Sequence, residues 1–311
     1  MKPRMMMILL HLSGVVVMIN RVIHHQRFNE AVDVVYDAYI RCLEEEPVIQ
    51  PVFGLSGVGK TFSIKLLTEK IRAGGEHEVL VVEFPPIRSY RAVIDECLMV
   101  FKLSPRAYKN EALALEGLRK QVESRGVKLI IFDEAQNLLE RKLGIDPKAM
   151  GDTIKHISNK CGVSIAVYGL PDAERLFKGD DQLARRSMAP FYFYPYEWVG
   201  AEFKCFRNAL GASIQYLHSL DIETFKINDL DFAKRMYVAS SGRIAFSEKL
   251  IKEVVRMKVK SAFLEEFETA YKRASYSLLL GSNPFAPDAK ISDQDMAMSY
   301  TSAMDQARAY V

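Results

Sequence analysis

Cysteine is scarce in this sequence and widely spaced. The 311 residues include four cysteines, none of them in a C-x-x-C pair: Cys42, Cys97, Cys161 and Cys205. Structural zinc sites need clustered ligands, and small secreted domains held together by disulfides are denser in cysteine. We therefore expect four reduced thiols in a cytoplasmic protein.

Long hydrophobic runs are lacking too. The most apolar stretch, residues 5–19, is interrupted by His11, Ser13 and Gly14, and it is shorter than the roughly 20 apolar residues of a membrane-spanning helix. Two cations precede it, as in a signal peptide, but no small-x-small cleavage site follows. For residues 1–18 we favour an unstructured leader or a later start of translation over an extra packed helix, and an export signal last. We expect no membrane partner.

Neither sign of charge dominates. Lysine and arginine number 42 against 39 aspartates and glutamates, so the formal net charge is +3. This mild excess permits nucleic-acid binding without arguing for it. With 49% hydrophobic and 26% charged residues, the chain has the composition of a globular protein long enough for one large and one small domain.

Apolar segments alternate with amphipathic ones over the first two thirds of the chain. The segments expected to be strands are residues 48–53, 79–84, 129–132, 163–168 and 191–194. The helices expected around and between them are residues 28–44, 61–71, 89–102, 110–124 and 147–160. This alternation predicts an α/β fold with a five-stranded parallel sheet flanked by helices.

The pattern changes after Trp198. Residues 200–276 have helical periodicity only, and residues 277–311 show no strong periodicity. We therefore expect an α/β domain over residues 19–199, a small helical domain over 200–276 and a tail over 277–311. The tail is expected to be extended before a short terminal helix.

Residues 54–61 fit the pattern G-x-x-x-x-G-K-S/T. Its glycines let several backbone N–H groups turn toward one anion, and the following helix adds its positive end. Lys60 would reach the β- and γ-phosphates of a nucleotide, and the Thr61 hydroxyl would bind Mg²⁺. A chance glycine turn is the alternative, but the motif lies between a predicted strand and a predicted helix. The expected nucleotide-binding residues here are Gly54, Leu55, Ser56, Gly57, Val58, Gly59, Lys60, Thr61 and Phe62.

A second motif lies about seventy residues downstream, where the apolar residues 129–132 lead directly into Asp133 and Glu134. A buried parallel strand that ends in carboxylates places them at the carboxyl edge of the sheet, beside the phosphate loop. Asp133 would bind Mg²⁺, and Glu134 would orient the attacking water. The alternative is an acidic pair that begins a surface helix. Together the two motifs predict Mg²⁺-dependent hydrolysis of a nucleoside triphosphate, and they do not exclude GTP.

With both motifs placed, residues 19–260 resemble AAA+ ATPases. More narrowly, they resemble the TniB/TnsC group of transposition regulators, with MuB-type proteins more distant. The resemblance rests on the leader at 19–28, E-F-P-P at 83–86 and D-E-A-Q-N-L-L at 133–139. It also rests on D-Q-L-A-R-R at 181–186, followed by the aromatic segment 193–198. These last two segments are the more specific ones.

The resemblance implies further site residues. Arg185 or Arg186 would be an arginine finger that reaches a neighbouring subunit's γ-phosphate, unless the pair is a solvated helix end. Arg243, after Ser-Ser-Gly, would contact the phosphates from the small domain, unless it is an exposed residue after a capping turn. One position departs from the family, because Leu170 stands where many relatives have a polar residue that senses the γ-phosphate. With Leu170 at this position we expect ATP hydrolysis to be slow, so that it times the release of an ATP-bound assembly, or to be absent.

Members of this group, by resemblance, assemble as ATP-bound rings or helical filaments on double-stranded target DNA and recruit a DDE-type transposase, in some cases with a target-selector protein. Arg88, Arg91 and Lys109 are the expected phosphate-backbone contacts, although solvated charges are the alternative for each. The segment 283–285 would be a peptide anchor for the transposase or part of a disordered end. A helicase loader or a nucleotide-gated signalling scaffold is the alternative function.

Overall fold

The computed structural model describes residues 26–75, 77–87, 89–139, 146–178, 181–274 and 283–308. The apolar leader 1–18 and Arg88 lie outside this part of the chain. Within it, no helix combines the length and the hydropathy needed to cross a membrane.

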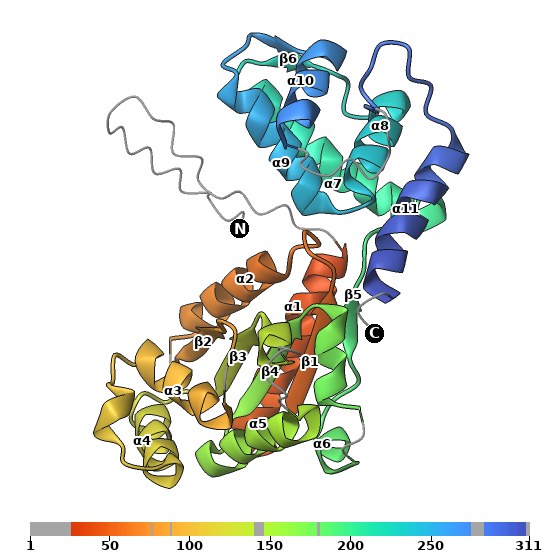
Figure 1. Cartoon of the computed structure of the whole chain (residues 1–311). Coiled ribbons are helices and arrows are strands. Elements are labelled where there is room, and N and C mark those ends of the chain that lie inside the picture. The colour runs from red at the N-terminus through yellow and green to blue at the C-terminus, as the bar shows by residue number, and fades with distance from the viewer. Residues whose placement is uncertain are drawn as a thin grey trace.

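A five-stranded sheet forms the centre of the larger domain (Figure 1). Its strands are β1 (Ile49–Gly54), β2 (Val79–Glu83), β3 (Leu129–Asp133), β4 (Ser164–Gly169) and β5 (Phe191–Phe193). The strand order is β2-β3-β4-β1-β5, and every neighbouring pair is parallel. The α/β fold expected from the alternating segments is therefore confirmed.

Helices cover both faces of this sheet. The helices of this domain are α1 (Gln26–Leu43), α2 (Lys60–Ala73), α3 (Tyr90–Val100), α4 (Glu111–Ser124), α5 (Pro147–Cys161) and α6 (Asp181–Arg186). Side chains of β3 alternate between two cores: Leu129 and Ile131 pack with α1 and α2, whereas Ile130 and Phe132 pack with α3, α4 and α5. Because parallel strands are buried on both faces, β3 is apolar from Leu129 to Phe132, and its first polar residue, Asp133, ends the strand.

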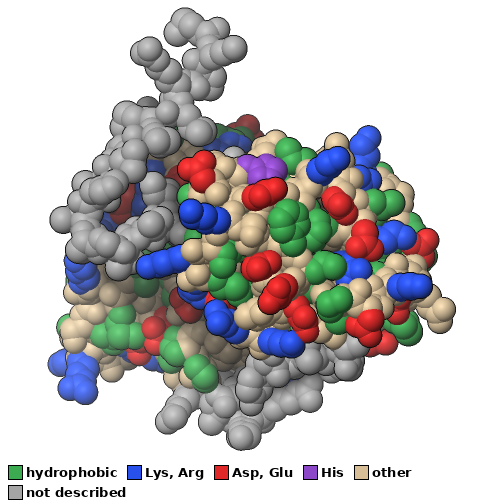
Figure 2. Space-filling view, turned by 90° about the horizontal axis from the view of Figure 1, so that it is seen from above, with side chains coloured by type: hydrophobic (Ala, Val, Ile, Leu, Met, Phe, Trp, Pro, Cys, Tyr) green, Lys and Arg blue, Asp and Glu red, His purple; other side chains and the backbone are tan. Residues whose placement is uncertain are grey.

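The smaller domain has its own core. It contains α7 (Gly200–Ser219), α8 (Leu230–Ser240), α9 (Ile244–Arg256) and α10 (Leu264–Ala274). The domain also contains a short parallel strand pair, β6 (Glu223–Thr224) and β7 (Ser261–Ala262). The expectation that residues 200–276 are entirely helical was therefore wrong in this detail. Figure 2 looks down onto this domain and shows acidic and basic side chains interspersed. This face therefore has no large patch of a single charge.

The segment expected to be an extended tail is folded onto the small domain. Phe285 is fully buried among Phe232, Phe267 and Tyr271. The Arg235 guanidinium donates hydrogen bonds to the carbonyl oxygens of Pro284, Ala286 and Ala289. Burial of the Phe285 ring therefore fixes the position of the tail. The sequence around Phe285 does not reveal this burial.

Helix α11 (Asp293–Arg308) continues this segment. It packs on α8, and its end returns to the larger domain, where Ala303 and Ala307 join the core under α1. Figure 1 shows the helix in dark blue, running from the small domain to the side of β5. Helix α11 therefore contacts both domains, and it lies beside the connection that leads from β5 into α7.

Candidate nucleotide site

The phosphate loop connects β1 to α2 in the context that the motif requires. Gly57 and Gly59 have positive φ angles of 80° and 116°, which favour glycine. Gly54 packs so closely that a Cβ atom there would lie 2.5 Å from the Phe193 carbonyl oxygen. Helix α2 begins at Lys60, and no side chain caps its N-terminus. The loop and the helix end therefore present backbone N–H groups of the kind that bind phosphate.

Lys60 is folded against its own loop. Its Nζ donates to the carbonyl oxygens of Gly54, at 2.6 Å, and Leu55, at 3.0 Å. The side chain is 8% exposed. Burial lowers the pKa of Lys60 to about 8, against the opposing effect of the nearby Glu134 and Asp133 carboxylates. A phosphate group in the loop would offer this ammonium a charged partner in place of neutral carbonyls.

The two carboxylates lie at the carboxyl end of β3. Asp133 is 6% exposed, and its Oδ1 accepts the N–H of Glu134 at 2.9 Å. Burial raises the pKa of Asp133 to about 6, with the Glu134 carboxylate adding to the shift. Glu134 itself has a φ of 56°, in the left-handed region. Both acids interact electrostatically with Lys60, so the structure brings together the two motifs that are about seventy residues apart.

Oxygen ligands suited to Mg²⁺ are present here. Thr61, the second residue of α2, is exposed, and Asp133 is the last residue of β3. Hydroxyl and carboxylate oxygens beside a phosphate-binding loop fit an ion that keeps several waters and binds substrate phosphates. No group of three or more His, Cys, Asp or Glu side chains placed to hold a metal occurs in the described ranges.

Arg243 approaches the phosphate loop from the small domain. It precedes α9, is 6% exposed, and donates from Nε to the Ser240 carbonyl oxygen at 3.1 Å. Burial lowers the pKa of Arg243 to about 10. No carboxylate in the described part of the chain forms an ion pair with it. A buried guanidinium without an anionic partner is costly, which makes Arg243 suited to an anionic ligand.

Phe246 links Arg243 to the loop and was not predicted. The Arg243 guanidinium carbon lies 4.3 Å from the centre of the Phe246 ring. A Cβ atom at Gly57 would lie 3.2 Å from the same ring, and the Ala245 N–H donates to the Gly57 carbonyl oxygen. The start of α9 therefore packs directly on the phosphate loop. Sequence alone gave no signal for this contact, because Phe246 lies in an ordinary amphipathic helix.

At the end of β4 the expected departure is present. Tyr168 is fully buried and points into the core that α1 and α2 cover, where its hydroxyl faces the Ser63 side chain of α2. Leu170 follows the strand and has no polar side chain. Its backbone N–H instead donates to Oε1 of Gln136 at 2.9 Å. Tyr168 therefore does not supply the polar group that many relatives have at this strand end.

Arg185 and Arg186 lie near the amino ends of the strands, whereas the phosphate loop lies at their carboxyl ends. Both are exposed at the end of α6, and Ser187 pairs with Ile49, the first residue of β1. The phosphate loop begins at the other end of β1, about 17 Å away at the usual rise per residue. Arg186 contacts the Asn159 side chain. Neither arginine can serve the loop of its own chain, so a finger role requires a neighbouring copy.

The expected DNA contacts differ in their surroundings. Arg91 forms an ion pair with Asp95 at 2.7 Å and donates to the carbonyl oxygens of Pro105 and Tyr108. Arg91 therefore helps to order the loop between α3 and α4, and its contact with DNA stays a prediction. Lys109 lies exposed in that loop.

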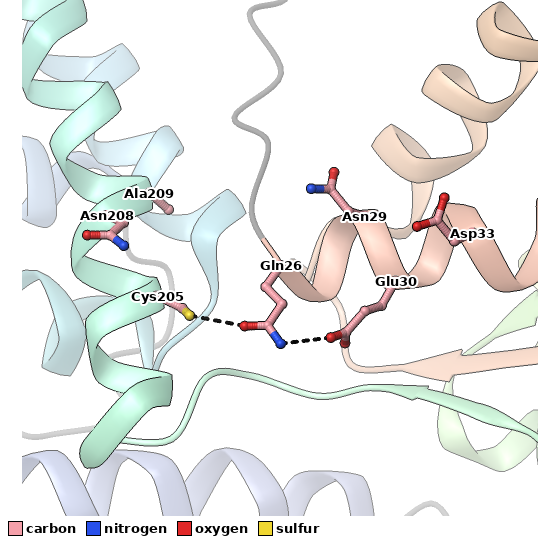
Figure 3. A pocket seen from close by; sticks show the side chains of 7 residues that line it. All are labelled: Gln26, Asn29, Glu30, Asp33, Cys205, Asn208 and Ala209. Atoms are coloured by element: carbon pink, nitrogen blue, oxygen red, sulfur yellow. Dashed lines mark hydrogen bonds between the residues drawn. The ribbon is translucent and has the colours of Figure 1, made fainter.

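A cavity of about 480 Å³ opens between α1 and α7 (Figure 3). Its lining residues are Gln26, Asn29, Glu30, Asp33, Cys205, Asn208 and Ala209. Gln26 bridges the walls, accepting from the Cys205 thiol and donating to Glu30. Phe28 points from the opposite side of α1 toward Gly59. The cavity is therefore separated from the phosphate loop by α1, and its acidic lining does not suit phosphate.

Comparisons with known proteins agree with this geometry. Residues 49–177 match the AAA domain family. No curated protein sequence matches the chain. Among solved structures, the ORC2 protein of Aeropyrum pernix in its ADPNP-ADP complexes superposes with a TM-score of 0.59 at 13% identity, over 83% of this chain and 70% of that one.

Two further structures are similar. Cdc6p of Pyrobaculum aerophilum has a TM-score of 0.61 at 14% identity, over 95% of this chain and 86% of that one. The ORC1 protein of Aeropyrum pernix in complex with DNA has a TM-score of 0.54 at 16% identity, over 80% of this chain and 65% of that one. The TniB/TnsC resemblance thus rests on the sequence motifs alone. Residues 49–177 therefore match the AAA domain family, and the chain shares the AAA+ fold with the ORC and Cdc6 structures.

Proposed function

We propose that this chain binds ATP with Mg²⁺, assembles on double-stranded DNA as an oligomer and hydrolyses ATP slowly. The observation that carries the proposal is the convergence of Lys60, Asp133 and Glu134 beside a loop of positive-φ glycines. Buried Arg243 adds a cation from the small domain. In this arrangement Lys60 and Arg243 bind phosphate, Thr61 and Asp133 hold Mg²⁺, and Glu134 orients water.

Assembly completes the site. Arg185 and Arg186 lie near the amino ends of the strands, so a finger from one copy would serve the nucleotide of the next. Arg185 is the better of the two, because Arg186 is engaged with Asn159. The nucleotide then lies between copies, and its γ-phosphate stabilises the oligomer that its hydrolysis releases.

DNA binding is supported by the loop between α3 and α4. Exposed Lys102 and Arg106 accompany Lys109 there, and residues 101–110 contain no acidic side chain. Cations of this kind contact phosphates without reading sequence. The A. pernix ORC1 protein of the same fold is described in complex with DNA. Arg88, Arg91 and Lys109 remain proposed contacts, together with Lys102 and Arg106.

The finer proposal is a transposition regulator that selects target sites and recruits a DDE-type transposase, with ATP hydrolysis driving disassembly. It is supported by the motifs at 133–139 and 181–198, which resemble the TniB/TnsC group. The second candidate is a helicase loader or initiator-like ATPase, which the similarity to Cdc6p favours. Both share the nucleotide site and differ in the protein that the DNA-bound oligomer recruits.

The test is a titration of fluorescent duplex DNA with purified protein in the presence of ATP, ADP or no nucleotide. We expect tight, salt-sensitive and sequence-indifferent binding with ATP alone, and its loss in Lys60→Ala. Nucleotide binding without any effect on DNA affinity would reject the DNA role and leave a nucleotide-gated scaffold. Stimulation of strand transfer by a DDE transposase, but not of helicase loading, would then decide between the two candidates.

A further inference from the structure

Two amide side chains follow the acidic pair and tie it to both neighbouring strands. Gln136 and Asn137 lie in the short helix η2 (Ala135–Leu139), directly after β3. Asn137 Nδ2 donates to the Phe84 carbonyl oxygen beyond β2 at 2.7 Å, whereas Gln136 bonds to Leu170 beyond β4. Because β3 lies between β2 and β4, the two amides fix the same turn from opposite sides.

The bond to Leu170 sets the orientation of the Gln136 amide. The Leu170 N–H needs an acceptor, so Oε1 faces it and the amide NH₂ group faces the other way. That NH₂ group donates to Oε2 of Glu134. Gly169 makes room for this bridge, since a Cβ atom there would lie 3.3 Å from Gln136 Oε1 and 2.7 Å from Ala173 Cβ. Gln136 therefore connects the Glu134 carboxylate to the end of β4.

The bridge holds Glu134 on the side of the phosphate loop. Glu134 interacts electrostatically with Lys60 of the phosphate loop. Its φ of 56° is uncommon for a residue other than glycine, and such angles persist where surrounding contacts enforce them. The amide of Gln136 is one such contact and holds one oxygen of the carboxylate that would orient water.

We propose that Gln136 is a positioning residue for Glu134, and that it supplies at the end of β4 the polar link that Leu170 cannot. This inference rests on the proposed function, because it assigns Glu134 its role in orienting water. Gln136 touches the carboxylate and the strand end, and acts on hydrolysis through Glu134. Loss of the amide leaves nucleotide binding intact and lets the carboxylate leave its reactive position.

The test compares Gln136→Leu with Asn137→Leu, which removes the matching amide on the β2 side and spares Glu134. Phosphate release is measured with Mg-ATP and duplex DNA, and nucleotide affinity is measured separately with a fluorescent analogue. For Gln136→Leu we expect kcat to fall about 10- to 100-fold, as for a misplaced catalytic group, with unchanged nucleotide affinity. Gln136→Glu, which places a second carboxylate against Glu134, should be at least as slow. Asn137→Leu should lower thermal stability but keep most of kcat.

Equal losses of kcat in Gln136→Leu and Asn137→Leu would overturn the inference, because they would reduce Gln136 to a support of the turn. A fall in nucleotide affinity that accounts for the lost rate would also overturn it. If the unchanged chain and Glu134→Gln release phosphate equally, the proposed hydrolysis is rejected and this inference with it. A difference between those two proteins, without an effect of Gln136→Leu, rejects the inference alone.

Discussion

The hydroxyl oxygen of Ser299 lies 2.8 Å from the hydroxyl oxygen of Ser241, and both residues are fully buried. Ser299 also donates to the Val238 carbonyl oxygen at 3.0 Å, so it accepts the hydrogen of Ser241. Ser299 belongs to α11, whereas Ser241 lies in the turn that leads to Arg243. The C-terminal helix therefore touches the turn that carries the cation proposed to bind phosphate.

Ser299→Ala should lower the free energy of unfolding by about 1–3 kcal/mol, because Ser241 loses a buried hydrogen-bond partner. Thr301→Ala is the matched control, since Thr301 is exposed on the same helix and should change stability by less than about 0.5 kcal/mol. Urea denaturation measures both. Equal effects of the two substitutions would contradict the buried contact.

Phe285→Ala should destabilise the small domain by about 3–5 kcal/mol, the usual cost of deleting a buried phenylalanine ring. The ring centre lies 5.5 Å from that of Phe267, so its removal leaves a cavity among aromatic side chains. Met298→Ala is the control, because Met298 is 46% exposed on α11 and its truncation should change stability little. A thermal unfolding profile like that of the control would instead favour the peptide-anchor interpretation of residues 283–285.

These contacts show where inference from sequence ends. The sheet was predictable because β3 is apolar up to Phe132 and its first carboxylate, Asp133, is at the strand end. The phosphate loop was predictable because the glycine spacing, the lysine and the strand and helix on either side are all local in the sequence. The burial of Phe285 was not, because it depends on Phe232 and Phe267, which other parts of the chain supply.

The same limit applies within the site. The pairing of Arg91 with the loop at 105–108 and the contact of Phe246 with Gly57 depend on how helices pack. Neither residue type nor spacing encodes such contacts. The missing polar residue at Leu170 was visible from sequence, but its neighbour Gln136 became visible only when β3 and β4 were placed side by side.

Asp133→Asn should stabilise the nucleotide-free protein at pH 8. Burial raises the pKa of Asp133 to about 6 from its ordinary 3.8, so the folded state holds the proton that the unfolded state has released between these values. Above pH 6 the folded chain carries a buried charge, and its removal should add up to about 3 kcal/mol to the free energy of unfolding. The gain fades as pH falls from 6 to below 4.

Urea unfolding in EDTA at pH 8 and pH 4 measures this difference, and the exposed Asp288→Asn is its control. The amide introduced by Asp133→Asn keeps an oxygen that can accept the Glu134 N–H, so local geometry is retained. A destabilisation of Asp133→Asn at pH 8 would contradict the burial cost. The same variant should weaken Mg²⁺-dependent ATP binding, because a neutral amide is a poorer ligand for this ion.

Arg185→Ala should leave ATP binding intact and lower ATP hydrolysis by about 10³-fold, the usual contribution of an arginine finger. Because the finger serves the neighbouring copy, mixing this variant with Glu134→Gln should restore part of the activity. The restored sites pair an intact Glu134 from one protein with Arg185 from the other. Arg186→Ala should cost less, since Arg186 is bound to Asn159. If the mixture hydrolyses ATP no faster than the two variants do separately, the shared site is rejected.

Alanine substitutions at Lys102, Arg106 and Lys109 test the DNA surface. Each should weaken ATP-dependent binding to duplexes of any sequence and reduce the slope of log affinity against log salt by about one, because each cation releases about one counterion. Lys226→Ala removes an exposed cation from the small domain and should leave the slope unchanged. Fluorescence anisotropy at several salt concentrations gives both quantities. An effect of Lys226→Ala as large as that of Lys109→Ala would mean that DNA contacts the small domain as well, and the loop between α3 and α4 would lose its assigned role.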